Sequence, residues 1–452
     1  PLIRARVISP DLKVHTLDVK TLAEEPAAAD GDRIYSDRRI LRGPLPGITA
    51  GAVVEQEIEV ADNLPFFEGG SVHRHRAYSG YAVLDRRLIV VSPAGRPVRV
   101  EPRDGAPPVS TTTHASGEIE TTVRIENAER KLPSTIGAPP DVALGAHYLV
   151  ATGRSWQDVA TRYSGIIDER IAGADVSDLT RGVSRGVAPE EAARVVLKNL
   201  KALVRYSGIE FGQASIVPWT PAQVLERRYG DCKDQAAILV AAFRALGLSA
   251  SVALLRTDWS FEADPQGPGL GDFDHAIVAL RDAGRLIWLD STADEPRVDM
   301  LPAGDQGRLA LIADPSATGL VRTSETRSTD NRVVESRTFD LPSHGAAIVT
   351  ESSEYFGGST AQHPSYTPDT KPEDLTALKD YAEREYLSKD VSVEAAPSST
   401  AASTRTFQMK VKGARRGAVD ASEAVVAVRP STFVSPFSDS IAGAPPAGQA
   451  EP

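Results

Sequence analysis

The chain contains one cysteine, Cys232, and its sequence neighbourhood is that of a nucleophile. Gly230 and Asp231 precede it, and Lys233 and Asp234 follow it, directly before an apolar run. At the start of a helix, free backbone N–H groups and the helix dipole favour an anion, so this position favours a thiolate. The alternative is an inert core cysteine, but such a residue more often lies in the middle of a helix or strand.

A thiolate needs a base, and the base needs a group that orients it. His275 precedes the apolar run 276–280, and Asp290 follows the apolar run 286–289. If residues 281–284 form a four-residue hairpin loop, His275 lies directly opposite Asp290, with Cβ atoms roughly 5 Å apart. A three-residue loop would put the two on different faces of the sheet. Taken singly, either residue could instead be a polar group with a structural role at a strand end.

The elements that would position these three residues alternate between helices and strands. Ser155, with Asp158 three residues later, is typical of a helix start. Pro189, followed by two glutamates, marks the start of a second helix. We expect helices at 155–171, from 189 to about 204, at 222–227 and at 235–246, and strands at 251–255, 275–280 and 286–290.

Both flanks of this region are expected to be rich in β-strands. Alternating apolar segments such as 53–60 and 87–91 predict a sandwich or a curved antiparallel sheet, with a Pro/Ser/Thr-rich loop at 105–116. The later strands are expected at 336–341, 346–355 and 406–411, with one helix at 372–387 and a disordered tail beyond Pro430. We therefore expect three domains: an N-terminal β-rich domain over 1–150, a catalytic core over 151–320, and a C-terminal β-rich domain over 321–452.

Charge and composition exclude several classes of function. The formal net charge is −11, so the chain is a poor polyanion binder and we expect no nucleic-acid partner. No apolar stretch reaches the roughly 18 to 20 residues of a membrane span, so we expect a chain that is not transmembrane. One cysteine cannot form an internal disulfide or a multi-thiolate zinc site.

A metal or cofactor site is not predicted. His73 and His75 flank Arg74 on a β-like segment and share one face, which makes a two-histidine metal site conceivable. No acidic or cysteine partner is near them in the sequence, so no metal is assigned. The chain has no His-Glu-x-x-His motif, no Walker loop and no Rossmann fingerprint, and no calcium-loop pattern.

The run Arg228–Asp234 and the apolar helix after it resemble the nucleophile helix of the transglutaminase-like superfamily, which has a papain-like cysteine core. His275 and the segment Trp288–Asp290 match the other two triad positions in order and approximate spacing. More narrowly, segments such as Pro44–Ile48 and Thr152–Trp156 resemble bacterial members with an N-terminal β-rich domain of unknown function. This resemblance also implies that the chain begins inside that domain.

The resemblance implies an α+β fold, with a papain-like, transglutaminase-like core between N-terminal and C-terminal β-rich, sandwich-like domains. Cys232 would attack a carbonyl, His275 would be general base and then acid, and Asp290 would orient His275. The backbone N–H of Cys232 could be one oxyanion donor. Gln213 and Trp219 are candidates for the second donor, and simple packing of a loop is the alternative for both.

The function implied is cysteine-dependent acyl transfer on peptide or protein amides through a thioester, in a peptidase, amidase or transglutaminase. Hydrolysis is favoured because it needs only water as acceptor. The alternative is a non-catalytic module that binds a protein or glycan and uses the core as a scaffold. Some superfamily members have lost activity, and the intact triad argues against that class. The resemblance further implies a peptide or protein substrate, a cell-envelope partner, a periplasmic or exported location, and no cofactor.

Overall fold

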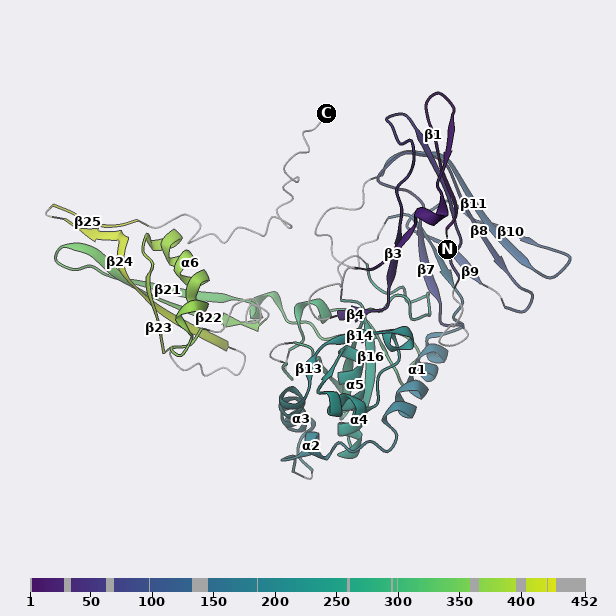
Figure 1. Cartoon of the computed structure of the whole chain (residues 1–452). Coiled ribbons are helices and arrows are strands. Elements are labelled where there is room, and N and C mark those ends of the chain that lie inside the picture. Colours follow the sequence, from purple (N-terminus) through teal and green to yellow (C-terminus); the bar gives the residue numbers. More distant parts are fainter. Residues whose placement is uncertain are drawn as a thin grey trace. The chain divides into compact units, whose positions relative to one another are not determined.

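The structure is a computed structural model of the 452-residue chain (Figure 1). It describes residues 2–27, 34–61, 69–96, 98–131, 145–184, 186–257, 261–293, 296–298, 300–357, 366–395, 404–420 and 422–427. The chain divides into two compact units. The first comprises Pro1–Leu132, Leu144–Val298 and Arg308–Arg322, and the second comprises Pro133–Ala143, Asp299–Gly307 and Thr323–Pro452.

The N-terminal part of the first unit is built from small antiparallel sheets. Their strand orders are β2-β1-β6, β3-β5, β10-β11-β8 and β7-β12-β9. The strands are β1 (Leu2–Ile8), β2 (Val14–Thr16), β3 (Ala23–Pro26), β5 (Arg39–Arg42), β6 (Val53–Ile58), β7 (Val72–Arg76), β8 (Val83–Ser92), β9 (Arg99–Arg103), β10 (Ser110–Thr113), β11 (Ile119–Ala128) and β12 (His147–Ala151). Strand β4 (Ile34–Ser36) lies outside these sheets and pairs in parallel with residues 208–210.

Strand β11 shows why this region folds as sheets. Val123 and Ile125 are buried while Arg124 and Glu126 between and after them are exposed, as expected for side chains that alternate between two faces. The loop expected over 105–116 is wrong in part, because residues 110–113 form β10 and pair with β11. These residues are one serine and three threonines, and threonine favours extended backbone.

The rest of the first unit alternates between helices and strands, as the sequence predicts. The helices are α1 (Trp156–Ile171), α2 (Ser177–Thr180), α3 (Pro189–Leu203), α4 (Pro221–Arg227) and α5 (Cys232–Ala245). The strands are β13 (Arg205–Tyr206), β14 (Gly208–Glu210), β15 (Tyr229–Gly230), β16 (Ala250–Leu255), β17 (His275–Asp282), β18 (Arg285–Leu289), β19 (Leu309–Ile312) and β20 (Val321–Arg322).

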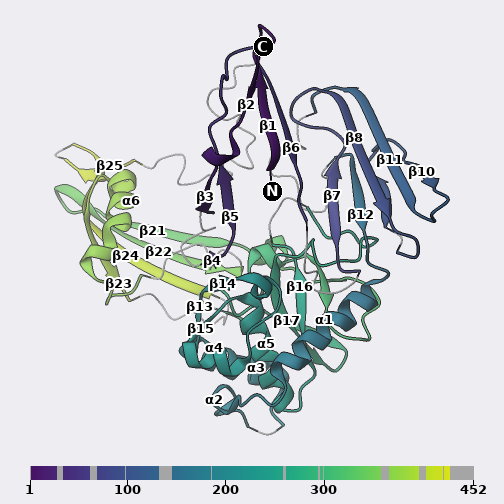
Figure 2. The ribbon, with the colours of Figure 1, turned by 45° about the vertical axis from the view of Figure 1, so that its right-hand side comes forward.

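Helix α5 lies at the centre of this region. All residues from Lys233 to Phe243 are buried, which is typical of a helix enclosed on every side. It packs against β16 and β17 of the antiparallel sheet β18-β17-β16-β19-β20, and helices α1, α3 and α4 also contact it (Figure 2). The start of α1 is as expected, because the Ser155 side chain accepts a hydrogen bond from the backbone N–H of Asp158 at 3.1 Å.

The second unit is a sheet covered by one helix. Its strand order is β21-β22-β24-β23, and β25 pairs with β24. Helix α6 packs on β23 and β24. The elements are β21 (Val333–Asp340), β22 (Gly345–Phe356), α6 (Thr376–Tyr386), β23 (Asp390–Glu394), β24 (Thr404–Val419) and β25 (Ala424–Val426). The α+β class with β-rich N-terminal and C-terminal regions is thus confirmed, and the tail beyond Pro430 lies outside the described residues.

None of the helices in the described part of the chain has the length and the apolar composition that a membrane crossing needs.

Candidate active site

Helix α5 presents Cys232 as its first residue. Asp231 caps the helix, since its side chain accepts the backbone N–H of Asp234 at 3.2 Å. In return the Asp234 carboxylate accepts the backbone N–H of Asp231 at 3.3 Å, which completes a capping box. The helix therefore begins three residues before the expected Gln235. Because backbone N–H groups of a first turn have no intrahelical partner, the N–H of Cys232 can donate a hydrogen bond to a negatively charged group beside the sulfur.

Gly230 is required by the tight turn that leads into Cys232. A Cβ atom at Gly230 would lie 2.8 Å from Asp234 Cβ and 3.1 Å from Val224 Cγ1, closer than side chains tolerate. The Gly230 carbonyl accepts a hydrogen bond from Gln235 Nε2 at 3.1 Å. The backbone before the cysteine is thus held from two sides.

Four charged residues, which we call the α5 cluster, surround the start of this helix: Arg227, Asp231, Lys233 and Asp234. Lys233 Nζ pairs with Asp231, and Arg227 Nη2 lies 2.6 Å from Asp234 Oδ2. Asp234 Oδ1 also accepts the backbone N–H of Trp219 at 2.8 Å. Burial and the neighbouring Asp231 carboxylate raise the pKa of Asp234 to about 6. Each of the two acids has a cation as its partner.

The hairpin that carries His275 and Asp290 differs from the expected one in its register. Asp282 pairs with Arg285, so the loop has two residues, Ala283 and Gly284, and not four. Both loop residues have positive φ, 45° and 88°, which is the backbone of a tight hairpin turn that matches strand twist. The prediction that His275 lies directly opposite Asp290 is therefore wrong. The strand register differs from the expected one by two residues, which keeps both side chains on the same face of the sheet. His275 and Asp290 are therefore diagonal neighbours.

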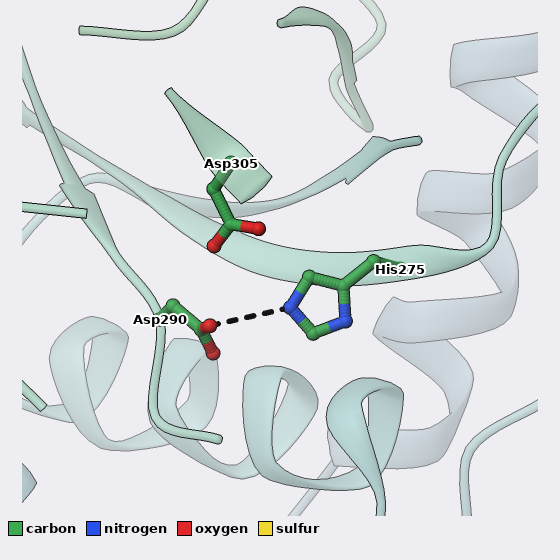
Figure 3. Close-up of side chains that lie close together, drawn as sticks. All are labelled: His275, Asp290 and Asp305. Carbon is green, nitrogen blue, oxygen red and sulfur yellow. Dashed lines mark hydrogen bonds and ion pairs between the residues drawn. The ribbon is translucent and has the colours of Figure 1, made fainter. Parts of the chain in front are cut away.

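His275 and Asp290 point toward one another from the ends of β17 and β18 (Figure 3). His275 Nε2 lies 3.3 Å from Asp290 Oδ2. Thr292 holds the carboxylate from the other side, because its backbone N–H donates to Asp290 Oδ1 at 2.7 Å and its hydroxyl donates to Oδ2 at 3.0 Å. Asp305, the third residue drawn in Figure 3, belongs to the second unit.

The protonation of this pair follows from burial and hydrogen bonding. Burial alone would lower the pKa of His275, but hydrogen bonds to Asp290 and Cys232 and their charges outweigh it and raise the pKa well above its usual value. Burial alone would raise the pKa of Asp290, yet His275 and Thr292 lower it overall. The structure thus brings the Cys232 side chain into hydrogen-bonding range of His275. Since Nε2 faces Asp290, Nδ1 is the ring nitrogen left for Cys232.

Cys232 itself is partly exposed, although the helix behind it is buried. Its side chain packs at the edge of the apolar core that α1, α3, α5 and the sheet share. The residue thus contacts the core and keeps part of its surface exposed. The arrangement can support nucleophilic chemistry: a partly exposed cysteine, a base within hydrogen-bonding range, and a carboxylate that orients the base.

The two candidates for a second oxyanion donor differ in the structure. Gln213 is exposed and lies in a short 3-10 turn over Gly212–Ser215. Trp219 is half-buried beside the α5 cluster, and its ring lies under the Arg227 guanidinium with the Arg227 Cζ 5.1 Å from the ring centroid. Among the described residues, no hydrogen-bond partner lies within reach of the buried indole N–H of Trp219. This unpartnered donor favours Trp219 over the exposed Gln213, which the sequence could not rank.

Two residues near the site escaped sequence reasoning. Thr292 follows Asp290 by two residues, and an aspartate that accepts from the residue two positions on is a common local turn, so the signal was present. Tyr163 on α1 lies near Cys232 and donates its hydroxyl to the Ile216 carbonyl at 3.0 Å. No local pattern marks that contact, which spans 53 residues.

His73 and His75 lie on β7, as expected, and both are exposed. Within the described residues, no third histidine, cysteine or carboxylate joins them in a group that could hold a metal ion.

Comparison with protein families finds two matches in this chain. Residues 1–130 match a domain of unknown function, DUF3857, and residues 177–281 match the transglutaminase-like superfamily. The second match includes Cys232 and His275 and ends before Asp290. Comparison with the curated proteins gave no match.

Three solved structures are similar to this chain. A candidate protease from Parabacteroides distasonis has 11% identity and a TM-score of 0.53, and the match covers 91% of this chain and 82% of that one. A candidate cysteine protease from Cytophaga hutchinsonii has 13% identity, a TM-score of 0.22, and coverage of 57% and 82%. A structure described as a TGase has 11% identity, a TM-score of 0.18, and coverage of 35% and 44%. The first of these shows a shared fold.

Proposed function

We propose that this chain, whose residues 177–281 match the transglutaminase-like superfamily and whose residues 1–130 match DUF3857, is a cysteine-dependent acyl-transfer enzyme that acts on peptide or protein amides. One observation carries the proposal. The only cysteine of the chain begins a buried helix, and its side chain is within hydrogen-bonding range of His275, which Asp290 holds at 3.3 Å.

The reaction would proceed in two halves. In the first, the Cys232 thiolate attacks the amide carbonyl and forms a C–S bond, while His275 donates its proton to the leaving nitrogen as the C–N bond breaks. In the second, water or an amine attacks the thioester carbonyl and gives a proton to His275, and the C–S bond breaks to restore the thiolate. Asp290 keeps its charge throughout and stabilises the imidazolium.

The oxyanion of the tetrahedral intermediate needs hydrogen-bond donors. The backbone N–H of Cys232 is one, because it belongs to the first turn of α5. We assign the second to the indole N–H of Trp219, a buried donor without a partner among the described residues. Its backbone N–H donates to the carboxylate of Asp234, in the first turn of α5, so the residue is anchored to the helix that carries the nucleophile.

Between hydrolysis and transamidation we favour hydrolysis. Water reaches any partly exposed thioester, whereas an amine acceptor needs a second binding site. The name of the Parabacteroides distasonis protein, a candidate protease, agrees with this choice.

The test is an assay with a glutamine-containing protein substrate and a labelled amine, using wild type and Cys232→Ala. We expect cleavage or deamidation that Cys232→Ala abolishes. Amine incorporation that depends on Cys232 would assign a transglutaminase instead. His275→Ala should be as inactive as Cys232→Ala, while His114→Ala, which alters an exposed histidine beside Glu120, should keep full activity. No Cys232-dependent product over a broad panel of peptides and proteins would overturn the proposal in favour of a binding module.

We also propose that the protein is periplasmic or exported, as bacterial proteins with this resemblance commonly are. Cell fractionation of the natural producer, probed with an antibody to this chain, tests the location, and a purely cytosolic signal would contradict it.

A further inference from the structure

Residues 261–274, which we call the His275 loop, end directly before His275 and connect it back toward β16. Several of their contacts are to residues of the N-terminal part of the first unit. The Leu270 backbone N–H donates to the Gly70 carbonyl at 2.8 Å. A Cβ atom at Gly271 would lie 2.6 Å from the Val72 carbonyl oxygen, so the loop lies against the backbone of β7.

One of these contacts is a buried ion pair between Arg74 of β7 and Asp272. Arg74 Nη1 pairs with Asp272 Oδ1, and the exposed fractions of the two side chains are 10% and 3%. Arg74 Nη2 donates to the Glu262 carbonyl at 3.3 Å. One guanidinium therefore holds both ends of the His275 loop.

Phe261 completes this attachment. The Arg74 Cζ lies 4.3 Å from the centroid of the Phe261 ring, and the Arg256 Cζ lies 3.8 Å from the same centroid. Arg256 Nη1 also donates to the backbone carbonyl of Asp272 at 3.3 Å. Two guanidinium groups thus share one aromatic ring and one aspartate, and such cation–π contacts gain strength when they are removed from water.

The attachment lies close to the base along the chain. Asp272 precedes His275 by three residues, and the two residues between them are also fixed. Phe273 packs on Trp156 with ring centroids 5.8 Å apart. The backbone N–H of Asp274 donates to the Leu255 carbonyl at 3.1 Å, and its carboxylate accepts the Thr257 N–H at 2.8 Å. Because the residues between them are held, we expect a displacement of Asp272 to displace His275 as well.

We propose that Arg74, in the DUF3857 region, is a positioning residue for His275: it acts through Asp272 and Phe261 to hold the base in line with Cys232. This inference rests on the proposed function, because it assigns a role to His275. It gives the N-terminal domain a part in the chemistry of the core. Arg74 itself would touch neither the substrate nor the reacting atoms.

Alkylation of Cys232 by iodoacetamide tests this without any substrate, and labelling reports only this residue because the chain has one cysteine. The rate is measured from pH 5 to 10 in the full chain for wild type, His275→Ala, Arg74→Gln and Arg74→Lys. Arg87→Gln is the matched control, since Arg87 lies on β8 of the same region and pairs with Asp85. Circular dichroism melts establish that each variant is folded.

We expect the wild-type profile to depend on His275. Arg74→Gln should shift the profile toward that of His275→Ala and slow labelling at pH 6 by about tenfold, because small misplacements of a catalytic group cost rate steeply. Arg74→Lys, which keeps a charge beside Asp272, should recover part of the loss, and Arg87→Gln should match wild type. If Arg74→Gln does not fold, Arg74→Lys and Phe261→Leu decide the question, and each should shift the profile partway.

Folded Arg74 and Phe261 variants that keep the wild-type profile would overturn this inference alone. A wild-type profile identical to that of His275→Ala would overturn the proposed function itself, and the positioning role with it.

Discussion

Two of the regions that bury a carboxylate beside a cation differ in one respect: the first has the features of an active site and the second does not. The α5 cluster lies at the start of a helix and surrounds Cys232, which is partly exposed and within range of His275. The other region, which we call the Glu351 cluster, lies in the second unit and consists of Arg337, Glu351, Tyr381 and Tyr386.

In the Glu351 cluster the carboxylate is saturated with donors. Arg337 Nε lies 3.1 Å from Glu351 Oε2, the Tyr381 hydroxyl lies 3.1 Å from both carboxylate oxygens, and the Tyr386 hydroxyl donates to Oε2. Burial raises the pKa of Glu351 above its usual value, although the two tyrosines and Arg337 oppose it. Both tyrosines come from α6 and Glu351 from β22, so the cluster attaches the helix to its sheet.

The difference teaches that buried charge does not by itself mark a site. Both clusters contain an acid whose pKa burial raises. The α5 cluster differs in two ways. Its four charged groups form ion pairs with one another and leave Cys232 beside them outside these pairs, and the base His275 has its own orienting partner, Asp290, outside the cluster. We therefore expect substitutions in the first region to change reactivity, and substitutions in the second to change stability.

The largest effect is expected for Asp290→Asn. The amide keeps the shape and the contact with Thr292, but it no longer favours the tautomer and the charge that His275 needs, so activity should fall by roughly 10³-fold to 10⁴-fold. The measurement is kcat/KM on any substrate that the assay above shows to be turned over, with Asp178→Asn as the matched control. Asp178 is exposed on α2 and pairs with Arg181, and its substitution should cost little. Equal losses in both variants would refute the orienting role.

Glu351→Gln should show the opposite behaviour. Removing the charge takes one carboxylate partner from the half-buried Arg337, and breaking a buried pair of this kind costs about 3 kcal/mol of stability. Hydrogen exchange of peptides from β22 and α6 should become faster, while the rate of Cys232 alkylation stays unchanged. Glu354→Gln, at an exposed position on the same strand, is the control. A loss of Cys232 reactivity in Glu351→Gln would break the comparison.

The pH dependence should also separate the two regions. The folded-state pKa of His275 is raised well above 6.5, so its contribution to stability is fully present below pH 6.5 and is lost as pH rises through the folded value. The thermal stability of wild type should accordingly exceed that of His275→Gln by more at pH 6 than at pH 9.5, and activity should fall as the pH rises through the folded-state pKa of His275. A stability difference that grows with pH would contradict this sign.

The smallest effect is expected for Tyr381→Phe. It removes one hydroxyl that donates to Glu351 and leaves the ring in place, which should cost about 1 kcal/mol. A chemical denaturation curve that follows the second unit measures it, and Tyr366→Phe, whose ring packs on Phe407, serves as the control. A change in Cys232 reactivity in Tyr381→Phe would weaken the distinction between the two regions.

Local sequence determined a large part of this protein. The N-cap of α1, the proline start of α3 and the position of Cys232 at a helix start all follow from residues within one turn of each other. The strands β16, β17 and β18 follow from short apolar runs between turn residues. Such features are readable because capping and side-chain alternation depend on neighbours in the chain.

Only the tertiary structure decided the other features. The hairpin loop has two residues because Ala283 adopts a left-handed backbone conformation, which an alanine in the sequence does not predict. Arg74 and Asp272 are 198 residues apart, and Trp219 meets Asp234 only because α4 and α5 pack together. Such contacts depend on register and on the packing of distant elements. The sequence could therefore indicate a nucleophile, a base and an acid, while their geometry, and what holds them in place, emerged only when the chain was folded.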